Sequence, residues 1–215
     1  MLFQDPMILI PFIPVLLLAL TLHEFGHAWT ALYFGDPTAK LAGRVTLDPL
    51  KHLDPMGTIF MLIAQFGWAK PVPVNPTNFT HPRADLWVSL AGIIANLIQA
   101  VLYALVFHAM LNVAPHLLGT GLDSFFGRFL VLGVLVNLSL ALFNLLPIFP
   151  LDGSHVLKNL LPWPQVRRFT EWSDRYGAMV LFGLLMIGSV SGFSPLSVLI
   201  GVPRNWLAGI LFNGI

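Results

Sequence analysis

The residues with the clearest chemical potential are two histidines that flank a glutamate in the run His23-Glu24-Phe25-Gly26-His27. On a helix, positions i and i+4 lie on one face, so both imidazoles can reach one metal ion from the same side. The chain contains no cysteine, so a zinc site must be built from histidine and carboxylate ligands. In a motif of this kind the glutamate serves as general base for a metal-activated water. The run therefore predicts a zinc site with Glu24 as the base.

The same run lies inside a long apolar segment, which makes these polar side chains expensive to keep. A charge at the centre of a bilayer costs about 2.5 to 3.5 kcal/mol on the scale from membrane-insertion experiments, which gives the lowest costs. A functional site explains why these polar residues are kept in the span better than a structural role does. The alternative is a hydrogen-bonded cluster that stabilises helix contacts. A second alternative is a transporter or proton-relay protein, because intramembrane His, Glu and Asp residues also mark ion paths.

A catalytic zinc ion normally takes three protein ligands and leaves one position for water, so a third ligand must come from elsewhere. Asp152 is the best candidate, because it follows the third long apolar block and is expected at the same depth as His23 and His27. The alternative for Asp152 is a cap or turn carboxylate before Gly153.

The elements that must position these residues are predicted to be membrane-spanning helices. Hydrophobic residues make up 56% of the 215 residues and charged residues only 10%, against roughly 25% charged in soluble domains. A span takes about 20 helical residues, and four blocks are long enough: 7–34, 85–111, 125–149 and 176–200. We expect an all-α polytopic membrane protein with one domain over residues 1–215. The net charge is +1 and the charged residues are scattered, so no basic stripe suggests a nucleic-acid partner.

The positions of lysine and arginine predict the orientation of the chain in the membrane. They gather in the links after the first and third blocks, as Lys40, Arg44, Lys51, Lys70 and Arg83, and as Lys158, Arg167, Arg168 and Arg175. Links rich in these residues lie in the cytoplasm. We therefore expect a multi-pass protein of the cell membrane whose site is reached from the cytoplasmic side.

The link between the first two blocks carries a pattern of its own. Gly43–Leu47 is predicted to be a short strand, Met56–Phe66 is apolar but too short to span, and Ala69–Asn75 alternates proline with valine. This pattern predicts a short re-entrant or β-hairpin-like segment over residues 43–75. Its extended edge could pair with an unwound substrate by strand addition. The alternative is a proline-rich connector that packs against the bundle.

Two separated motifs resemble those of the site-2 protease family of intramembrane zinc metalloproteases: Leu20-Thr21-Leu22-His23-Glu24-Phe25-Gly26-His27, and Asn144-Leu145-Leu146-Pro147 with Leu151-Asp152-Gly153. The resemblance covers nearly the whole chain. It implies His23, His27 and Asp152 as ligands of one zinc ion, Glu24 as base, and hydrolysis of peptide bonds in transmembrane substrates. It also implies that Asn144 positions substrate or the developing oxyanion, a role that an amide donor can fill. The alternative for Asn144 is a helix-packing amide.

The chain departs from many relatives of this family, which carry a PDZ module or an appended sensor domain. Residues 112–124 are too few for a module, so recognition is expected to use the membrane region or a separate partner. Asn96 is expected either to touch substrate or to bond between helices. His52 with Asp54 is either a pair that supports the site or simply solvated. The remaining histidines have no partner at ligand spacing and are expected to be structural: His81, His108, His116 and His155.

Overall fold

Helices make up most of the computed structural model, which describes residues 6–64, 67–119, 124–191 and 194–213. The longer helices are α1 (Pro6–Tyr33), α3 (Pro55–Ala64), α4 (Ala84–Val113), α5 (Phe125–Asn144), α6 (Asp152–Leu160), α7 (Gln165–Ser191) and α8 (Pro195–Asn213). Short turns of helix are α2 (Thr38–Leu41), η2 (Pro49–Lys51), η3 (Pro76–Asn78) and η4 (Pro115–Leu117). The all-α prediction is confirmed.

The described ranges contain no β-strand, so the predicted hairpin-like detail is not formed. Residues 43–47 are a turn, and the β pairing that remains is an isolated antiparallel bridge between Leu53 and Ala69. Within the predicted apolar run Met56–Phe66, the described residues belong to α3, and residues 65 and 66 lie outside the described ranges.

Four helices are long and apolar enough to cross a membrane: Met7–Tyr33, Ala84–Val113, Phe125–Asn144 and Pro195–Asn213. The first three correspond to predicted blocks, but the predicted fourth block 176–200 is wrong in its bounds, because it overlaps both α7 and α8. Ser194 caps α8 by accepting a hydrogen bond from the Ser197 amide at 3.2 Å. Pro195 then occupies the first helical position, where its missing N–H is least costly.

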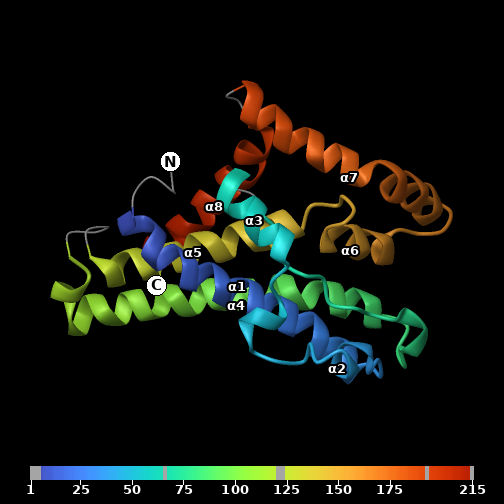
Figure 1. The fold of residues 1–215 in the computed structure, drawn as a ribbon, viewed down its shortest axis with the longest axis horizontal. Coiled ribbons are helices and arrows are strands. Elements are labelled where there is room, and N and C mark those ends of the chain that lie inside the picture. Colours follow the sequence, from blue (N-terminus) through green and yellow to red (C-terminus); the bar gives the residue numbers. More distant parts are fainter. Residues whose placement is uncertain (1–5, 65–66, 120–123, 192–193, 214–215) are drawn as a thin grey trace.

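The bundle core is formed by α1, α4 and α5, with α8 packed against it (Figure 1). Small and β-branched side chains meet there, among them Val15 of α1, Ala100 and Ala104 of α4, and Val134 of α5. Small residues allow close packing of helices in a membrane, where apolar burial alone gives little driving force. Large apolar side chains on the outer faces, such as Ile98, stay exposed, as expected of a surface that meets lipid.

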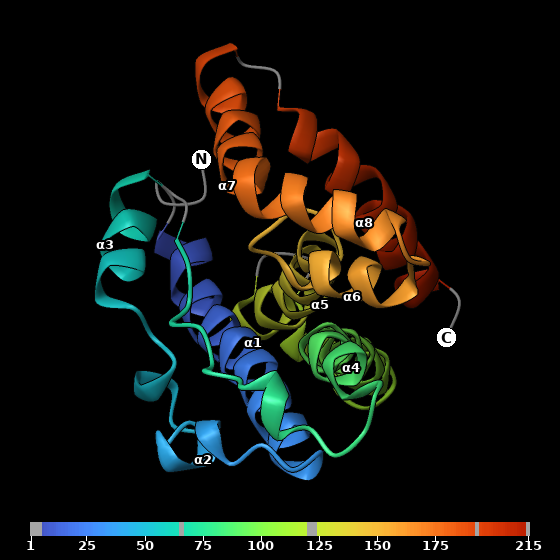
Figure 2. The same ribbon diagram turned by 90° about the vertical axis from the view of Figure 1, so that its right-hand side faces the viewer.

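The short helix α6 joins the bundle to α7 (Figure 2). Viewed in that direction, α3 lies beside α1 on the side away from α4. The third span ends at Asn144, earlier than the predicted residue 149, and Asp152 begins the separate helix α6. Gly153 makes the close return possible, because a Cβ there would lie 2.2 Å from the Leu145 carbonyl oxygen. Glycine at this position thus brings the start of α6 against the end of α5.

Candidate metal centre

Side chains from two helices converge on one point. The Nε2 atoms of His23 and His27 are 3.0 Å apart, and the Asp152 Oδ2 atom lies 3.2 Å from the first and 3.3 Å from the second. Both histidines come from one face of α1, and Asp152 comes from the first turn of α6. The structure therefore brings together the three residues that the sequence motifs predicted as metal ligands.

The other ring nitrogens of the two histidines are held by hydrogen-bond acceptors on α4. His23 Nδ1 lies 2.7 Å from Asn96 Oδ1, and His27 Nδ1 lies 2.7 Å from the Val88 carbonyl oxygen. Because a carbonyl oxygen can only accept, the Val88 contact requires a proton on Nδ1 of His27, and the Asn96 amide oxygen requires the same of His23. In neutral imidazoles both Nε2 lone pairs then point at the ligand position.

Gly92 of α4 packs directly against the two imidazoles. A Cβ added there would lie 2.4 Å from His27 Nε2 and 2.6 Å from His23 Cε1, closer than such atoms approach in proteins. No side chain other than hydrogen fits this position without moving the histidines. The glycine therefore fixes how closely α4 can support the site.

The three converging atoms fit a zinc ion. Tetrahedral coordination with bonds of about 2.0 to 2.1 Å places ligand atoms about 3.3 to 3.4 Å apart, close to the separations of His23, His27 and Asp152. The Asp152 Oδ2 atom is buried and receives no hydrogen bond, since both facing nitrogens present lone pairs. Three acceptors with no shared proton are suited to a cation, and two histidines with one carboxylate leave a fourth position open.

The site forms one wall of a cavity of about 470 Å³. Glu24 lies on this wall beside His23, and its side chain is mostly buried. Asn144 also lines the cavity and donates one amide hydrogen to the Leu140 carbonyl oxygen of its own helix at 3.1 Å. An amide carries two hydrogens, so one remains for another acceptor. The remaining walls come from Leu20, residues 67–69, Pro71, Val72, Val74, Asp85, Val88, Ser89, Leu140, Phe143, Pro150, Leu151, His155 and Leu181.

Residues 69–75 form no helix or strand beyond the bridge at Ala69, and several of them line the cavity. Val72 and Val74 line the cavity and are half-buried, and Pro73 between them is exposed; Pro71, also exposed, reaches the cavity as well. Within the described residues, the amides of Val72 and Val74 donate no hydrogen bond. This alternation is that of a strand edge without a partner.

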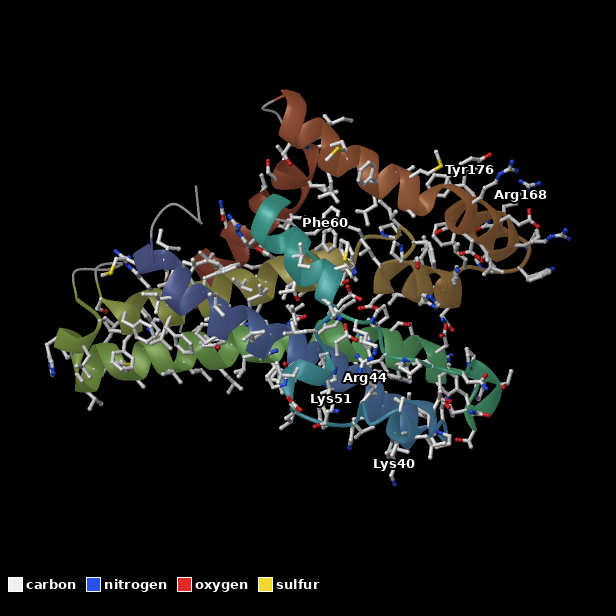
Figure 3. All side chains as sticks on the ribbon, in the orientation of Figure 1. Lys40, Arg44, Lys51, Phe60, Arg168 and Tyr176 are labelled. Atoms are coloured by element: carbon white, nitrogen blue, oxygen red, sulfur yellow. The ribbon has the colours of Figure 1, made fainter. Side chains whose placement is uncertain are left out.

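The buried side chain of Arg44 holds one end of this segment. It donates to the Lys70 carbonyl oxygen at 2.6 Å and to the Pro71 carbonyl oxygen at 2.9 Å. His52 is also buried, lies 3.3 Å from the Arg44 guanidinium and donates through Nε2 to the Thr46 carbonyl oxygen. Figure 3 shows Lys40 and Lys51, by contrast, at the outer surface.

Asp36 holds the other end of the segment. Its carboxylate accepts hydrogen bonds from the Asn75 amide at 2.7 Å, from Asn78 Nδ2 at 2.8 Å and from Thr38. Burial raises the pKa of Asp36, but these hydrogen bonds outweigh burial and hold the pKa below its ordinary value. The ionised carboxylate thus joins the end of α1 to residues 75–78.

Asn96 forms hydrogen bonds between helices, which is the second of the two roles that the sequence left open. Besides accepting from His23, it donates to the Ala19 carbonyl oxygen at 3.1 Å and to Asn137 Oδ1 at 2.9 Å. Asn137 in turn donates to the Gly133 carbonyl oxygen. Sequence reasoning missed Asn137, although an asparagine inside an apolar span was a usable signal.

The other polar residues have separate roles. Asp54 caps α3 by accepting from the Gly57 amide at 2.8 Å, so it is not paired with His52. His108 donates to the Leu211 carbonyl oxygen and joins α4 to α8. His155, expected to be merely structural, lies on the cavity wall 3.5 Å from Asp85. The Val88 carbonyl could not have been found from the sequence, because a backbone acceptor carries no residue-type signal.

Comparison with known proteins agrees with this geometry. The profile described as Peptidase family M50 matches residues 114–188. The chain is 44% identical over 186 residues to YwhC of Bacillus subtilis, whose name describes a zinc metalloprotease, covering 84% of this chain and 83% of YwhC. It is 36% identical to Rip2 of Mycolicibacterium smegmatis and 34% identical to Rip2 of Mycobacterium tuberculosis, proteins with the same description. These matches cover 79% and 82% of this chain, and 64% and 67% of the relatives.

No solved structure matches the chain significantly. The identity to YwhC over most of both chains nevertheless shows the family, and the three converging ligand atoms agree with its zinc chemistry. The chain belongs to peptidase family M50, the site-2 type of zinc metalloprotease.

Proposed function

We propose that this protein hydrolyses peptide bonds of transmembrane protein substrates within or beside the bilayer, with zinc held by His23, His27 and Asp152. The observation that carries the proposal is the convergence of Nε2, Nε2 and Oδ2 at 3.0 to 3.3 Å on the wall of a cavity. Two of these ligands and Glu24 lie in a helix long and apolar enough to span a membrane. A cleavage site at that depth is suited to a substrate that is itself a membrane span.

Glu24 is the proposed general base. When bound, zinc supplies Lewis acidity, which polarises a carbonyl and lowers the pKa of a water to about 7. The Glu24 carboxylate accepts a proton from the attacking water and passes it to the amide nitrogen as the C–N bond breaks. Its place beside His23 on the cavity wall supports this role.

Asn144 is proposed to assist by donating its free amide hydrogen to the oxyanion that develops on the scissile carbonyl. The second amide hydrogen of Asn144 is donated to the Leu140 carbonyl oxygen, and this bond fixes the orientation of the amide at the end of α5. Asn144 lines the same cavity as Glu24 and Asp152, which supports this assignment.

Substrate is proposed to bind as an extended strand along residues 71–74. A transmembrane helix buries its peptide bonds in its own hydrogen bonds, so it must unwind locally before cleavage. The free amides of Val72 and Val74 offer an edge to the unwound segment, and both side chains face the cavity that holds Glu24. Residues of low helix propensity near the cut would lower the cost of unwinding.

Water is proposed to reach the site from the cytoplasmic side. In Figure 3, Arg168 lies at the end of the molecule away from the turn that joins α4 to α5, and Lys40, Arg44 and Lys51 lie between that end and the middle. Positively charged links of this kind remain in the cytoplasm. Residues 67–69, Pro71, Val72 and Val74, which belong to the link that carries Lys40, Arg44 and Lys51, line the cavity, and this supports access from that side.

The proposal is tested with the full chain in proteoliposomes that contain a labelled transmembrane peptide. We expect cleavage in the presence of zinc, loss of cleavage after the zinc is chelated, and recovery of cleavage when zinc is added back. A protein that cleaves no peptide but moves protons or metal ions across the liposome, unaffected by the chelator, would instead be a transporter or proton relay.

A further inference from the structure

We infer that Asp85 is a positioning residue for the third metal ligand, through a side-chain cross-link between α4 and α6; the inference rests on the proposed zinc site. Asp85 Oδ2 accepts a hydrogen bond from Asn159 Nδ2 at 2.6 Å. Asp85 Oδ1 lies 3.5 Å from His155 Nδ1. One carboxylate in the first turn of α4 thereby holds two residues of α6 that are one helical turn apart.

The two helices joined by Asp85 carry different parts of the metal centre. α4 supports both histidines, through the Val88 carbonyl, the Asn96 amide and the close contact at Gly92. α6 carries Asp152 as its first residue, one turn before His155. The distance from the histidine Nε2 atoms to Asp152 Oδ2 therefore depends on where α6 sits against α4.

Asp85 makes the polar side-chain contacts that join α4 to α6. In the described residues, no other side-chain hydrogen bond or ion pair joins α4 to α6. The opposite side of α6 is tied to α7 by Lys158 Nζ, which donates to Asp174 Oδ1 at 2.9 Å. Asp174 is exposed and lies on α7, so Asp174→Ala offers a matched control that removes a tie of the same helix α6 without changing a residue of α4.

A plainer role for Asp85 exists, since an acidic residue in the first turn of a helix is favoured by the helix dipole. That role would affect the stability of α4 but not the separation of the metal ligands. The two roles differ in zinc affinity, which a dipole effect leaves unchanged. They also differ in the response to Asn159, which lies on α6 and outside the α4 dipole.

The test measures zinc affinity of the full chain by competition with a chromophoric chelator, for wild type, Asp85→Ala, Asp85→Asn, Asn159→Ala and the control Asp174→Ala. We expect Asp85→Ala to lower zinc affinity about tenfold, the lower end of the range for groups that orient ligands. Asp85→Asn retains one acceptor oxygen and is expected to lose less. Asn159→Ala changes an exposed residue, so it keeps the test open if Asp85→Ala does not fold.

The outcomes separate this inference from the proposed function. Wild-type affinity in both Asp85→Ala and Asn159→Ala would overturn the positioning role while leaving the zinc site intact. A loss equal to that of Asp174→Ala would do the same, because it would reflect general loosening of α6. A wild-type chain that binds no zinc would instead remove the proposed function itself.

Discussion

The Nδ1 atom of His23 lies 2.7 Å from Oδ1 of Asn96, a residue 73 positions later in the chain and on another helix. The contact fixes the proton of His23 on Nδ1 and directs Nε2 toward Asp152. Asn96 is in turn held by Ala19 and Asn137, so the orientation of one ligand depends on three helices.

Substitution of Asn96 by alanine is expected to weaken zinc binding by about 10- to 100-fold, the usual effect of removing a partner that orients a ligand. His23 would lose its acceptor, and the Asn137 amide oxygen would lose its donor. Chelator competition measures the change. Asn112→Ala is the control, because Asn112 lies on the same helix and its side chain, among the described residues, bonds to the His108 carbonyl oxygen of that helix. Equal affinities in the two variants would show that Asn96 does not orient His23.

Replacing Gly92 by alanine is expected to abolish zinc binding or to reduce it at least as strongly as Asn96→Ala. The added Cβ would overlap His27 Nε2 and His23 Cε1, so at least one imidazole must leave its position. Gly209→Ala on α8 is the control, because a Cβ there meets nothing within 4 Å. Metal content after purification distinguishes them, and a Gly92→Ala protein with full zinc content would mean that the histidines are less constrained than the packing indicates.

The convergence of the three proposed ligands was predictable because these side chains belong to residue types that are costly in or beside an apolar helix. His23, Glu24 and His27 stand out in a block that is otherwise apolar, and Asp152 stands beside Gly153 after another such block. The acceptors behind them were not predictable in the same way. Val88 contributes only a carbonyl, and the role of Asn96 depends on how α1 packs against α4.

The fold was predicted well where hydrophobic length alone decides the element. The predicted bounds of the fourth span are wrong because residues 176–200 are apolar across the boundary between two helices. Ser194 and Pro195 are the sequence signal for the start of the second of these helices. The predicted strand at 43–47 failed for a different reason. Arg44 in that stretch bonds to the carbonyls of Lys70 and Pro71 through its side chain, and the backbone forms a turn.

Loss of the Arg44 side chain is expected to raise KM for a transmembrane peptide by about tenfold while zinc content stays unchanged. Arg44 secures the carbonyls of Lys70 and Pro71 at one end of the proposed substrate edge, and a hydrogen bond to a charged group contributes about 1.5 to 3 kcal/mol. Steady-state cleavage by Arg44→Ala is compared with Lys51→Ala, which removes an exposed charge nearby. If Arg44→Ala changes kcat alone, residues 71–74 do not bind substrate as proposed.

The contribution of Asp36 to stability is expected to depend on pH. Folding lowers the pKa of Asp36, so the ionised side chain stabilises the fold at every pH above its unfolded value of about 3.9. This stabilisation is lost as the pH falls through the lower pKa of the folded state. Thermal unfolding in detergent should therefore show Asp36→Asn well below wild type at pH 7, with the gap closing under acid conditions. A gap that is constant from pH 7 into that range would contradict the assignment.

The central claim is that zinc at His23, His27 and Asp152 works with Glu24 to hydrolyse a peptide bond in a membrane substrate. The most direct measurement is the cleavage rate of a transmembrane peptide by wild type and Glu24→Gln, with zinc content determined on the same preparations. The expected result is one zinc per chain in both proteins and a kcat about 10² to 10⁴ times lower in the variant, the usual contribution of a general base. A Glu24→Gln protein that holds zinc and cleaves at the wild-type rate would contradict the claim.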